Sequence, residues 1–281
     1  IDGYSIGEKN IDNVNAGKTL FELYDLTGKE KYKKAADLVY SQIEIMPRCQ
    51  NEARSFWHKD IYPNQVWLDG LYMGLPFYLE YETRYNDRKN YSDIFGQFKF
   101  VIENMRNPIN GLYFHAMDTS REAFWCDKVT GLSQHSWLRA IGWYTMALID
   151  TLDQVDNKDH KYDAECKMLE DAFKDLVDSM LKYQDESGMW YQVVNYGGME
   201  KNLRQAEVQL WHMHFLRLYV LDIFLMITHS MPRKQLMASV KDTLRLMKMV
   251  HYHSVVSVLL QDLVVMEEDL VHMTIICQSQ S

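Results

Sequence analysis

The chain has 281 residues, of which 47% are hydrophobic, and its formal net charge is -9. This length suits one large domain with a substantial core, and we expect one domain rather than two small ones. The negative charge argues against general affinity for nucleic acid or for membrane surfaces, so local Arg or His residues must hold any anionic ligand. Apolar runs fall short of the roughly 18 residues that a membrane span needs, so none is expected.

The cysteines and the first residue bear on the compartment. Four cysteines are scattered without CxxC spacing: Cys49, Cys126, Cys166 and Cys277. We expect them to be free thiols, which favours a reducing, cytoplasmic compartment. Because the chain opens at Ile1 rather than Met, we also expect a truncated N-terminus, and a preceding signal peptide stays compatible with the sequence.

Apolar residues recur at helical spacing along most of the chain. We expect one helix over residues 13–27, ending at Gly28, and another over 29–46, closed by Pro47. Further helices are expected over 63–85, 91–106, 133–154 and 160–184. Strands should be confined to short pieces of the polar, Gly-containing loops. The sequence thus predicts an all-α domain.

A short aromatic motif repeats in these loops. Asn110–His115 reads NGLYFH, Ser187–Gln192 reads SGMWYQ, and Ser55–His58 is a degenerate third copy. Each copy follows one helix and precedes another, so the repeating unit is a helical hairpin with an aromatic connection. Stacked hairpins form an open solenoid or a closed toroid. Trp and Tyr gathered at one rim favour the toroid, whose rim would bind flat apolar faces such as those of sugar rings.

The run Trp67–Met73, WLDGLYM, places an acid among large apolar neighbours. Burial penalises the charged form of a carboxyl group, so Asp69 could keep its proton near neutral pH and donate it. The alternative, that Asp69 only caps or decorates a core helix, is the commoner role of an Asp beside aromatic residues. Pro63 is a favourable first residue for this helix. With that start, Gln65, Asp69 and Met73 share one face at i, i+4 spacing and point into the cup.

Five motifs, in this order, together resemble the unsaturated rhamnogalacturonyl hydrolases of glycoside hydrolase family 105. They are FWHK at 56–59, YPNQVWLDGLYM at 62–73, GLYFHAMD at 111–118, WLRAIGWY at 137–144, and YQD with GMWYQ within 183–192. The resemblance covers about residues 8–202. It implies an (α/α)6 toroid, here incomplete at both ends, with no metal or cofactor. The implied reaction removes a 4,5-unsaturated galacturonic acid from the non-reducing end of pectin-derived rhamnogalacturonan oligosaccharides.

The resemblance also implies roles for three charged residues. Asp69 would protonate C4 of the vinyl ether, giving an oxocarbenium ion at C5, and would then assist the water that captures it. Asp12 matches the second acidic position of the family and would orient substrate or water. Arg139 is the natural partner of the substrate carboxylate, because a guanidinium forms paired, charge-assisted hydrogen bonds. A structural ion pair is the alternative role of Arg139.

Five aromatic residues complete the predicted substrate site. Trp57, Trp137 and Trp143 could form walls against the sugar ring, although isolated aromatic residues on helices are usually core. His58 and His115 could bond sugar hydroxyls, whereas an isolated His is more often a satisfied core or surface residue. Two other classes stay open. Unsaturated glucuronyl hydrolases, family 88, are similar in fold and chemistry, and a non-catalytic helical-repeat binding module would be favoured by an exposed aromatic rim and a solvated Asp69.

The family pattern ends after Asn202. All 13 glycines lie at or before Gly198, and the remaining segment is rich in His and Met. Its clusters Trp211–His214 and His251–His253 lack a spaced carboxylate or Cys partner, so we expect no metal site.

We expect a one-nucleotide frameshift near Leu203 to explain this break. Codons permitted for residues 204–215, RQAEVQLWHMHF, encode EASGSAAMAYAF when read one nucleotide earlier, and members of the family continue with a Glu-Ala-Ser-Gly-Ser helix. The same offset over Glu267–Gln280 can give GGRFGSYDYYLSEP, a second family signature. The observed residues fix two nucleotides of each recovered codon, so two such matches are not expected by chance. Residues 1–202 would be the family-like segment and 203–281 a frameshifted tail of the same domain, with low stability and weak or no activity.

Overall fold

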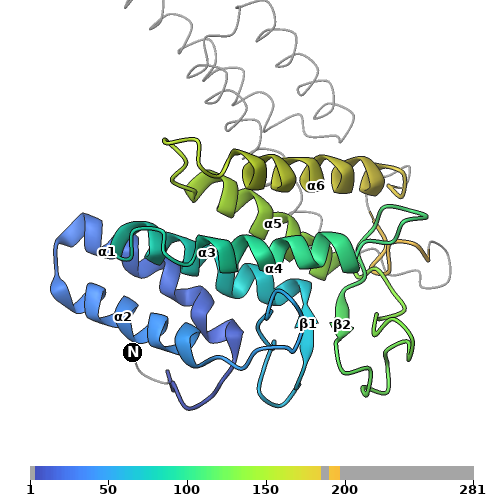
Figure 1. Ribbon diagram of the computed structural model, residues 1–281, viewed down its shortest axis with the longest axis horizontal. Coiled ribbons are helices and arrows are strands. Elements are labelled where there is room, and N and C mark those ends of the chain that lie inside the picture. Colours follow the sequence, from blue (N-terminus) through green and yellow to red (C-terminus); the bar gives the residue numbers. More distant parts are fainter. Residues whose placement is uncertain (1–3, 185–189, 197–281) are drawn as a thin grey trace, which may run out of the picture. The chain divides into compact units, whose positions relative to one another are not determined.

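Six α-helices follow one another as three hairpins in the computed structural model, which describes residues 4–184 and 190–196 (Figure 1). The hairpins pair α1 (Lys18–Thr27) with α2 (Glu30–Ile45), α3 (Leu68–Tyr85) with α4 (Tyr91–Asn104), and α5 (Leu138–Gln154) with α6 (Asp163–Leu181). A 3-10 helix, η1 (Ile11–Gly17), precedes α1. The expected all-α class of helical hairpins is confirmed.

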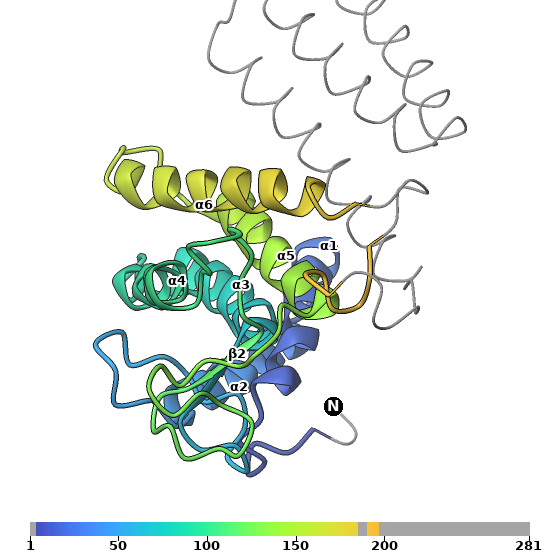
Figure 2. The same cartoon turned by 90° about the vertical axis from the view of Figure 1, so that its right-hand side faces the viewer.

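In the second and third hairpins, the first helix is the inner one and the second the outer one. Eleven of the 18 residues of α3 and eleven of the 17 of α5 are buried, against six of 14 in α4 and six of 19 in α6. The first hairpin does not show this difference, because two of 10 residues of α1 and four of 16 of α2 are buried. Helix α3 contacts η1, α1, α2, α4 and α5, and it lies between the neighbouring helices in both views (Figures 1 and 2). The inner and outer helices of these two hairpins match the arrangement expected of a toroid of α/α hairpins.

Most predicted helices are found close to their expected bounds. Gly28 ends α1 in the left-handed conformation, with φ 60°, and its N–H donates to the Tyr24 carbonyl at 2.7 Å. The predicted start of the third helix at Pro63 is wrong. Residues Gln65–Trp67 instead form a strand, β1, which pairs antiparallel with β2 (Ala116–Asp118). The helix predicted over 133–154 likewise begins only at Leu138.

Two glycines let η1 approach α3 closely. A Cβ atom on Gly74 would lie 2.8 Å from the Ile11 side chain, and one on Gly17 would lie 2.8 Å from the ring of Phe77. Real Cβ contacts are never this short, so these positions require glycine. The close packing brings the first residues of η1 beside the first turn of α3.

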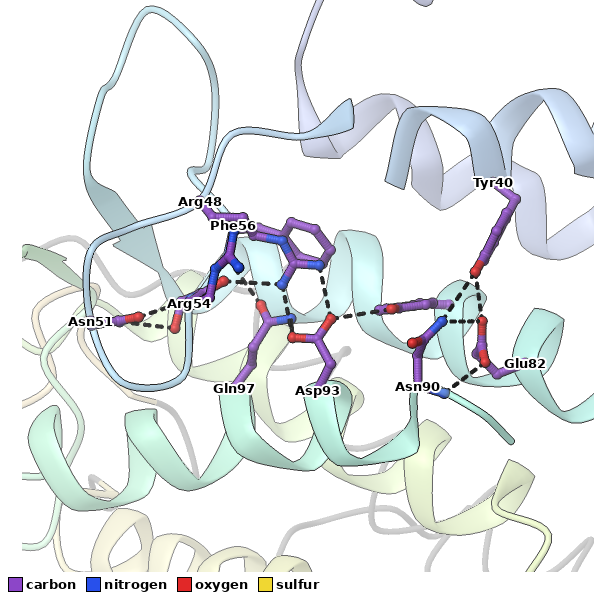
Figure 3. Close-up of polar contacts among 11 residues, drawn as sticks. Tyr40, Arg48, Asn51, Arg54, Phe56, Glu82, Asn90, Asp93 and Gln97 are labelled. Carbon is purple, nitrogen blue, oxygen red and sulfur yellow. Dashed lines mark hydrogen bonds and ion pairs between the residues drawn. The ribbon is translucent and has the colours of Figure 1, made fainter. Parts of the chain in front are cut away.

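A buried polar cluster joins α2, α3 and the start of α4 (Figure 3). Glu82 is fully buried, and its carboxylate accepts hydrogen bonds from the Tyr40 hydroxyl at 2.7 Å and from the Asn90 backbone N–H at 2.8 Å. The side-chain amides of Asn86 and Asn90 also donate to it, at 2.9 and 3.0 Å. Several donors thus satisfy a buried carboxylate that would otherwise be destabilising. We call these residues the Glu82 cluster.

Several predictions fall outside the described residues. They concern the frameshifted tail, the His and Met clusters, Cys277 and the residues of the second aromatic motif before Trp190. Within the described part, Cys49, Cys126 and Cys166 are free thiols, as expected. The helices described there include none with both the length and the apolar character needed to cross a membrane.

Candidate active site

The beginnings of η1, α3 and α5 are built alike. The first residue of each donates its backbone N–H to a carbonyl in the next aromatic loop: Ile11 to His58 (3.1 Å), Leu68 to His115 (3.0 Å) and Leu138 to Gln192 (2.8 Å). The second residues of the three elements are Asp12, Asp69 and Arg139. The repeated aromatic motif is therefore also a structural repeat, and it places three predicted charged residues at equivalent positions.

Asp69 is 93% shielded from solvent, with a relative exposure of 7%. Burial raises the pKa of its carboxyl group, and the nearby charge of Asp12 acts in the same direction. The charge of Arg139 and a hydrogen bond from the Asp69 backbone at the helix start lower the pKa, but burial is the larger effect. Asp69 therefore keeps its proton to a higher pH than an ordinary Asp. A solvated Asp69, which would favour a binding module, is not found.

Asp12 has a different environment. Its Oδ2 atom lies 2.9 Å from Nζ of Lys59, and its Oδ1 atom lies 3.6 Å from Nε2 of His58. The side chain is 36% exposed, so water can reach it. The two carboxyl groups thus have different environments. Asp69 is buried and has one long contact to Arg139, whereas Asp12 is partly exposed and forms a closer salt bridge to Lys59. Such a difference is what separates a proton donor from a charged partner.

His58 is held in a stack of aromatic rings. Its ring lies parallel to Trp67, with centroids 4.4 Å apart, and the ring of Tyr62 stacks on Trp67 with centroids 5.3 Å apart. Burial lowers the pKa of His58 to about 4, although the charge of Asp12 opposes this. At neutral pH the imidazole is therefore uncharged, with Nε2 toward Asp12.

His115 is also an uncharged imidazole, because burial lowers its pKa. Its Nδ1 atom lies 2.9 Å from the His135 carbonyl oxygen, which can only accept a hydrogen bond. We therefore assign the proton to Nδ1, which leaves Nε2 as an acceptor for a donor such as a sugar hydroxyl. The ring meets Trp137 edge-on, with centroids 5.9 Å apart.

Arg139 lies between Asp69 and Trp137. Its Nη2 atom is 3.5 Å from Oδ1 of Asp69, and its guanidinium carbon is 3.7 Å from the centre of the Trp137 ring. The side chain is still 39% exposed. One long contact to Asp69 is not the two-bond fork that Arg forms with a fully engaged carboxylate. Arg139 is therefore anchored on an aromatic face and able to pair with a second carboxylate.

Three other predicted residues lie further from this centre. Gln65 is on β1 rather than α3, so its predicted place on the Asp69 helix face is wrong, and its Oε1 accepts a hydrogen bond from Nε1 of Trp67 at 3.0 Å. Met73 is half-buried, one turn beyond Asp69 on α3. Trp143 is one turn beyond Arg139 on α5 and stacks on Tyr72, with centroids 4.9 Å apart.

The aromatic motif does not supply the rim in the way that its pattern predicts. Tyr113 and Trp190 are fully buried core residues, and Nε1 of Trp190 donates to the Met180 carbonyl at 2.7 Å. Trp57 and Trp137 are half-buried and lie beside the site. In each copy the first aromatic residue is buried in the core and its neighbour is half-buried.

Sequence reasoning missed Lys59, Trp67 and Gln192. Lys59 forms the salt bridge to Asp12, and Trp67 supports the His58 ring. Gln192 occupies the position in its loop that His58 and His115 occupy in theirs. The alignment of the three motif copies could have identified Gln192, and a cation directly after His58 could have identified Lys59.

Comparisons with known proteins agree with this arrangement. The chain matches the model of Glycosyl Hydrolase Family 88 over residues 2–206. It is 33% identical to Protein Atu3128 of Agrobacterium fabrum over 134 residues, which are 48% of this chain and 55% of that protein. It is 25% identical over 193 residues to the unsaturated rhamnogalacturonyl hydrolase YesR of Bacillus subtilis, covering 66% of this chain and 52% of YesR.

Among solved structures, the chain is similar to a family 105 glycoside hydrolase of C. acetobutylicum. The identity is 38%, the TM-score is 0.74, and the match covers 87% of this chain and 65% of that one. The chain spans about half the length of the curated relatives that it matches. The family match covers most of the chain and includes every candidate residue. The chain therefore belongs to glycosyl hydrolase family 88 and is related to the structures of family 105, which confirms the resemblance found in its motifs.

Proposed function

We propose that the protein hydrolyses glycosidic bonds, removing a 4,5-unsaturated galacturonic acid from the non-reducing end of rhamnogalacturonan oligosaccharides. The observation that carries the proposal is the buried carboxyl of Asp69, whose pKa burial raises, with Arg139 3.5 Å away. Family membership and the similarity to YesR support this reaction class.

The proposed reaction begins with proton transfer. Asp69 donates its proton to C4 of the vinyl ether, and the positive charge develops at C5 and the ring oxygen. Water adds at C5 while the Asp69 carboxylate accepts a proton from it. The resulting hemiketal opens by breaking the bond between C5 and the ring oxygen, which leaves a ketone at C5 and a hemiacetal at C1. This hemiacetal breaks down to an aldehyde and releases the remaining sugar with a free hydroxyl group. A positioned acid that then acts as a base contributes about 10²–10⁴-fold to the rate.

Arg139 gives the reaction its geometry. The substrate carboxylate is attached to C5, directly beside the C4 atom that receives the proton. A guanidinium that holds this carboxylate next to Asp69 therefore also brings C4 to the proton donor. Asp12, with its side chain partly exposed beside Lys59, would orient the water or a sugar hydroxyl.

An unsaturated glucuronyl hydrolase is the second candidate, because the same residues serve it equally. Galacturonic and glucuronic acids differ only in configuration at C4, and the C4=C5 double bond removes that difference. Specificity must therefore lie in the contacts to the sugar that is left behind.

The decisive test follows the absorbance of the double bond in the near-ultraviolet. We expect this absorbance to fall when the protein, with its reading frame restored after Leu203, meets an unsaturated rhamnogalacturonan disaccharide. A disaccharide from a glycosaminoglycan should react more slowly. A folded, restored protein that binds either sugar without loss of absorbance would support the binding module instead.

Replacement of Arg139 should alter both binding and pH dependence. Turnover needs protonated Asp69, so kcat/KM should fall as pH rises through the raised pKa of Asp69. The positive charge of Arg139 lowers the pKa of Asp69, so Arg139→Met should raise this pKa further. The fall of kcat/KM on the alkaline side of the pH profile should therefore move to higher pH. The lost hydrogen bonds to a charged group, about 1.5–3 kcal/mol, should raise KM by roughly 10- to 100-fold. Arg139→Lys should have a KM between those of the parent and Arg139→Met. If the alkaline fall of kcat/KM in Arg139→Met moves to lower pH, the assigned role of Arg139 is wrong.

A further inference from the structure

The loop between α2 and β1 brings Trp57 and His58 to the candidate site, and a polar cluster on α4 holds this loop (Figure 3). Both terminal guanidinium nitrogens of Arg48 donate to the Asp93 carboxylate, each at 2.8 Å. Arg48 also donates to the Arg54 carbonyl at 3.0 Å, across the base of the loop. We call Arg48, Asp93 and Gln97 the α4 clamp.

Gln97 connects the clamp to the residue before Trp57. Its Oε1 atom accepts a hydrogen bond from the Phe56 backbone N–H at 3.1 Å, and its Nε2 atom donates to Asp93 at 3.4 Å. The Arg48 guanidinium covers the Phe56 ring, 3.7 Å from its centre. Gln97 is buried, with 3% exposure, so these hydrogen bonds are shielded from water. Both arms of the loop are thus tied to one side of α4.

Helix α3 also contacts the clamp. The Tyr78 hydroxyl donates to Oδ2 of Asp93 at 3.2 Å. The backbone closes the loop independently, because Cys49 N–H donates to the Ser55 carbonyl at 2.8 Å and Trp57 N–H donates to the Pro47 carbonyl at 2.9 Å. The loop is therefore a closed unit, and the clamp fixes where that unit sits on α4.

The rings of Trp57 and His58 depend on this placement. A small pocket lies behind them, lined by Phe56, Trp57, His58, Gly70 and Gln97 among others. Nδ1 of His58 and Nε1 of Trp57 are buried and have no hydrogen-bond partner among the described residues. The His58 ring lies close to Gly70, where a Cβ atom would come within 3.2 Å of Nδ1. On this side, no hydrogen bond to the described residues holds the rings.

The next loop has a similar anchor. Arg106 lies at the base of the loop that leads to His115, and its backbone forms an isolated antiparallel β-bridge with Tyr113. Its Nη2 atom is 3.5 Å from Oδ2 of Asp175 on α6. In the first loop, Arg48 likewise forms a bridge to Phe56. The pair of Arg106 and Asp175 is more exposed than the pair of Arg48 and Asp93, so it should contribute less. Within the described residues, α4 thus anchors the loop that follows α2, and α6 anchors the loop that follows α4.

We propose that Arg48, Asp93 and Gln97 are positioning residues, which set the place of Trp57 and His58 at the site without touching the substrate. The effect on turnover rests on the proposed function, whereas the effect on the His58 ring does not. The charged groups that face this ring are Asp12, Lys59 and Arg139. None of them belongs to the clamp.

The test compares Arg48→Met with Tyr40→Phe in the full chain. Tyr40→Phe removes the hydroxyl that donates to Glu82 and accepts from Asn86 and Asn90 in the Glu82 cluster. Glu82 lies about 20 Å from Asp69 along α3 by helix rise, so this variant serves as the matched control. Histidine NMR, with His58 assigned by a His58→Gln variant, gives the first readout. In the unchanged chain His58 should stay uncharged down to about pH 4. With Arg48→Met it should titrate closer to its ordinary value, because a loosened loop lets water reach the ring. Tyr40→Phe should leave the titration unchanged.

The second readout is kinetic. In the frame-restored protein, Arg48→Met should lower kcat/KM for the unsaturated disaccharide by about 10- to 100-fold, as displaced binding groups do, with a smaller loss for Arg48→Lys. Gln97→Met removes the hydrogen bonds of Gln97 to Phe56 and Asp93 but keeps the ion pair of Arg48 with Asp93, and it replaces Arg48→Met if that variant does not fold. If the clamp variants match Tyr40→Phe in both readouts, the inference is wrong. If His58 shifts but neither the frame-restored parent nor its variants turn over an unsaturated disaccharide, the positioning role stands and the proposed function fails.

Discussion

Asp69→Asn should lower kcat by about 10²–10⁴-fold in the frame-restored protein, the range that a positioned general acid supplies. Asn has nearly the same shape but cannot deliver a proton to C4. The buried position between apolar residues and Arg139 should accept the amide without rearrangement. Turnover is measured by the loss of double-bond absorbance, and disaccharide binding by tryptophan fluorescence. Binding should persist.

The same variant has a second, opposite effect on stability. The pKa of Asp69 is higher in the folded chain than in the unfolded one. At pH values between these two pKa values, the folded state therefore binds more protons than the unfolded state. Folding stability contributed by this group therefore falls as pH rises above the unfolded pKa. Asp69→Asn removes that loss, so its unfolding midpoint at neutral pH should equal or exceed that of the parent. Asp171→Asn on the outer face of α6 is the matched control and should change neither property. Retained turnover in Asp69→Asn would refute the role of this residue.

Restoring the reading frame after Leu203 should raise both the unfolding midpoint and the activity above those of the chain as written. In the proposed frame, residues 204–215 become EASGSAAMAYAF, and the tail regains the family signature near its end. The match to the family model ends at residue 206, close to the proposed shift. Correct apolar patterning would then replace a tail whose apolar content alone does not specify packing.

The coding DNA provides a direct check of this proposal. The codons for residues 204–215 must include the third-position choices that encode the family helix in the earlier frame. Other choices at these positions would exclude the frameshift, whatever the two proteins do. If the codons agree, thermal unfolding and the absorbance assay compare the two proteins, and equal values would show that the tail has no effect on the site.

Local chemistry allowed much of the fold to be predicted from the sequence. Gly28 ends its helix as expected, because the left-handed conformation there is a local property. The start of α3 was not predictable in this way. Residues Gln65–Trp67 pair with β2, some fifty residues later, and this non-local pairing overrides the helical pattern that begins at Pro63.

Prediction of the site shows the same division. The burial of Asp69 could be predicted from the apolar residues beside it in the sequence, and Leu68 and Leu71 are buried as well. The salt bridge between Lys59 and Asp12 joins a loop to η1, 47 residues apart in the sequence, so neither residue indicates the other as its partner. Burial of Tyr113 depends on the facing helices, and an aromatic pattern by itself does not separate core from rim.

The position of the candidate residues in the first part of the chain has a consequence for the order of synthesis. All ten predicted site residues lie between Asp12 and Trp143. A growing chain leaves the ribosome from its N-terminus at roughly 5–20 residues per second, and N-terminal parts fold first. Every side chain of the site is therefore made several seconds before the last residue of the tail, in either frame. The tail is made after every part of the candidate site is already present.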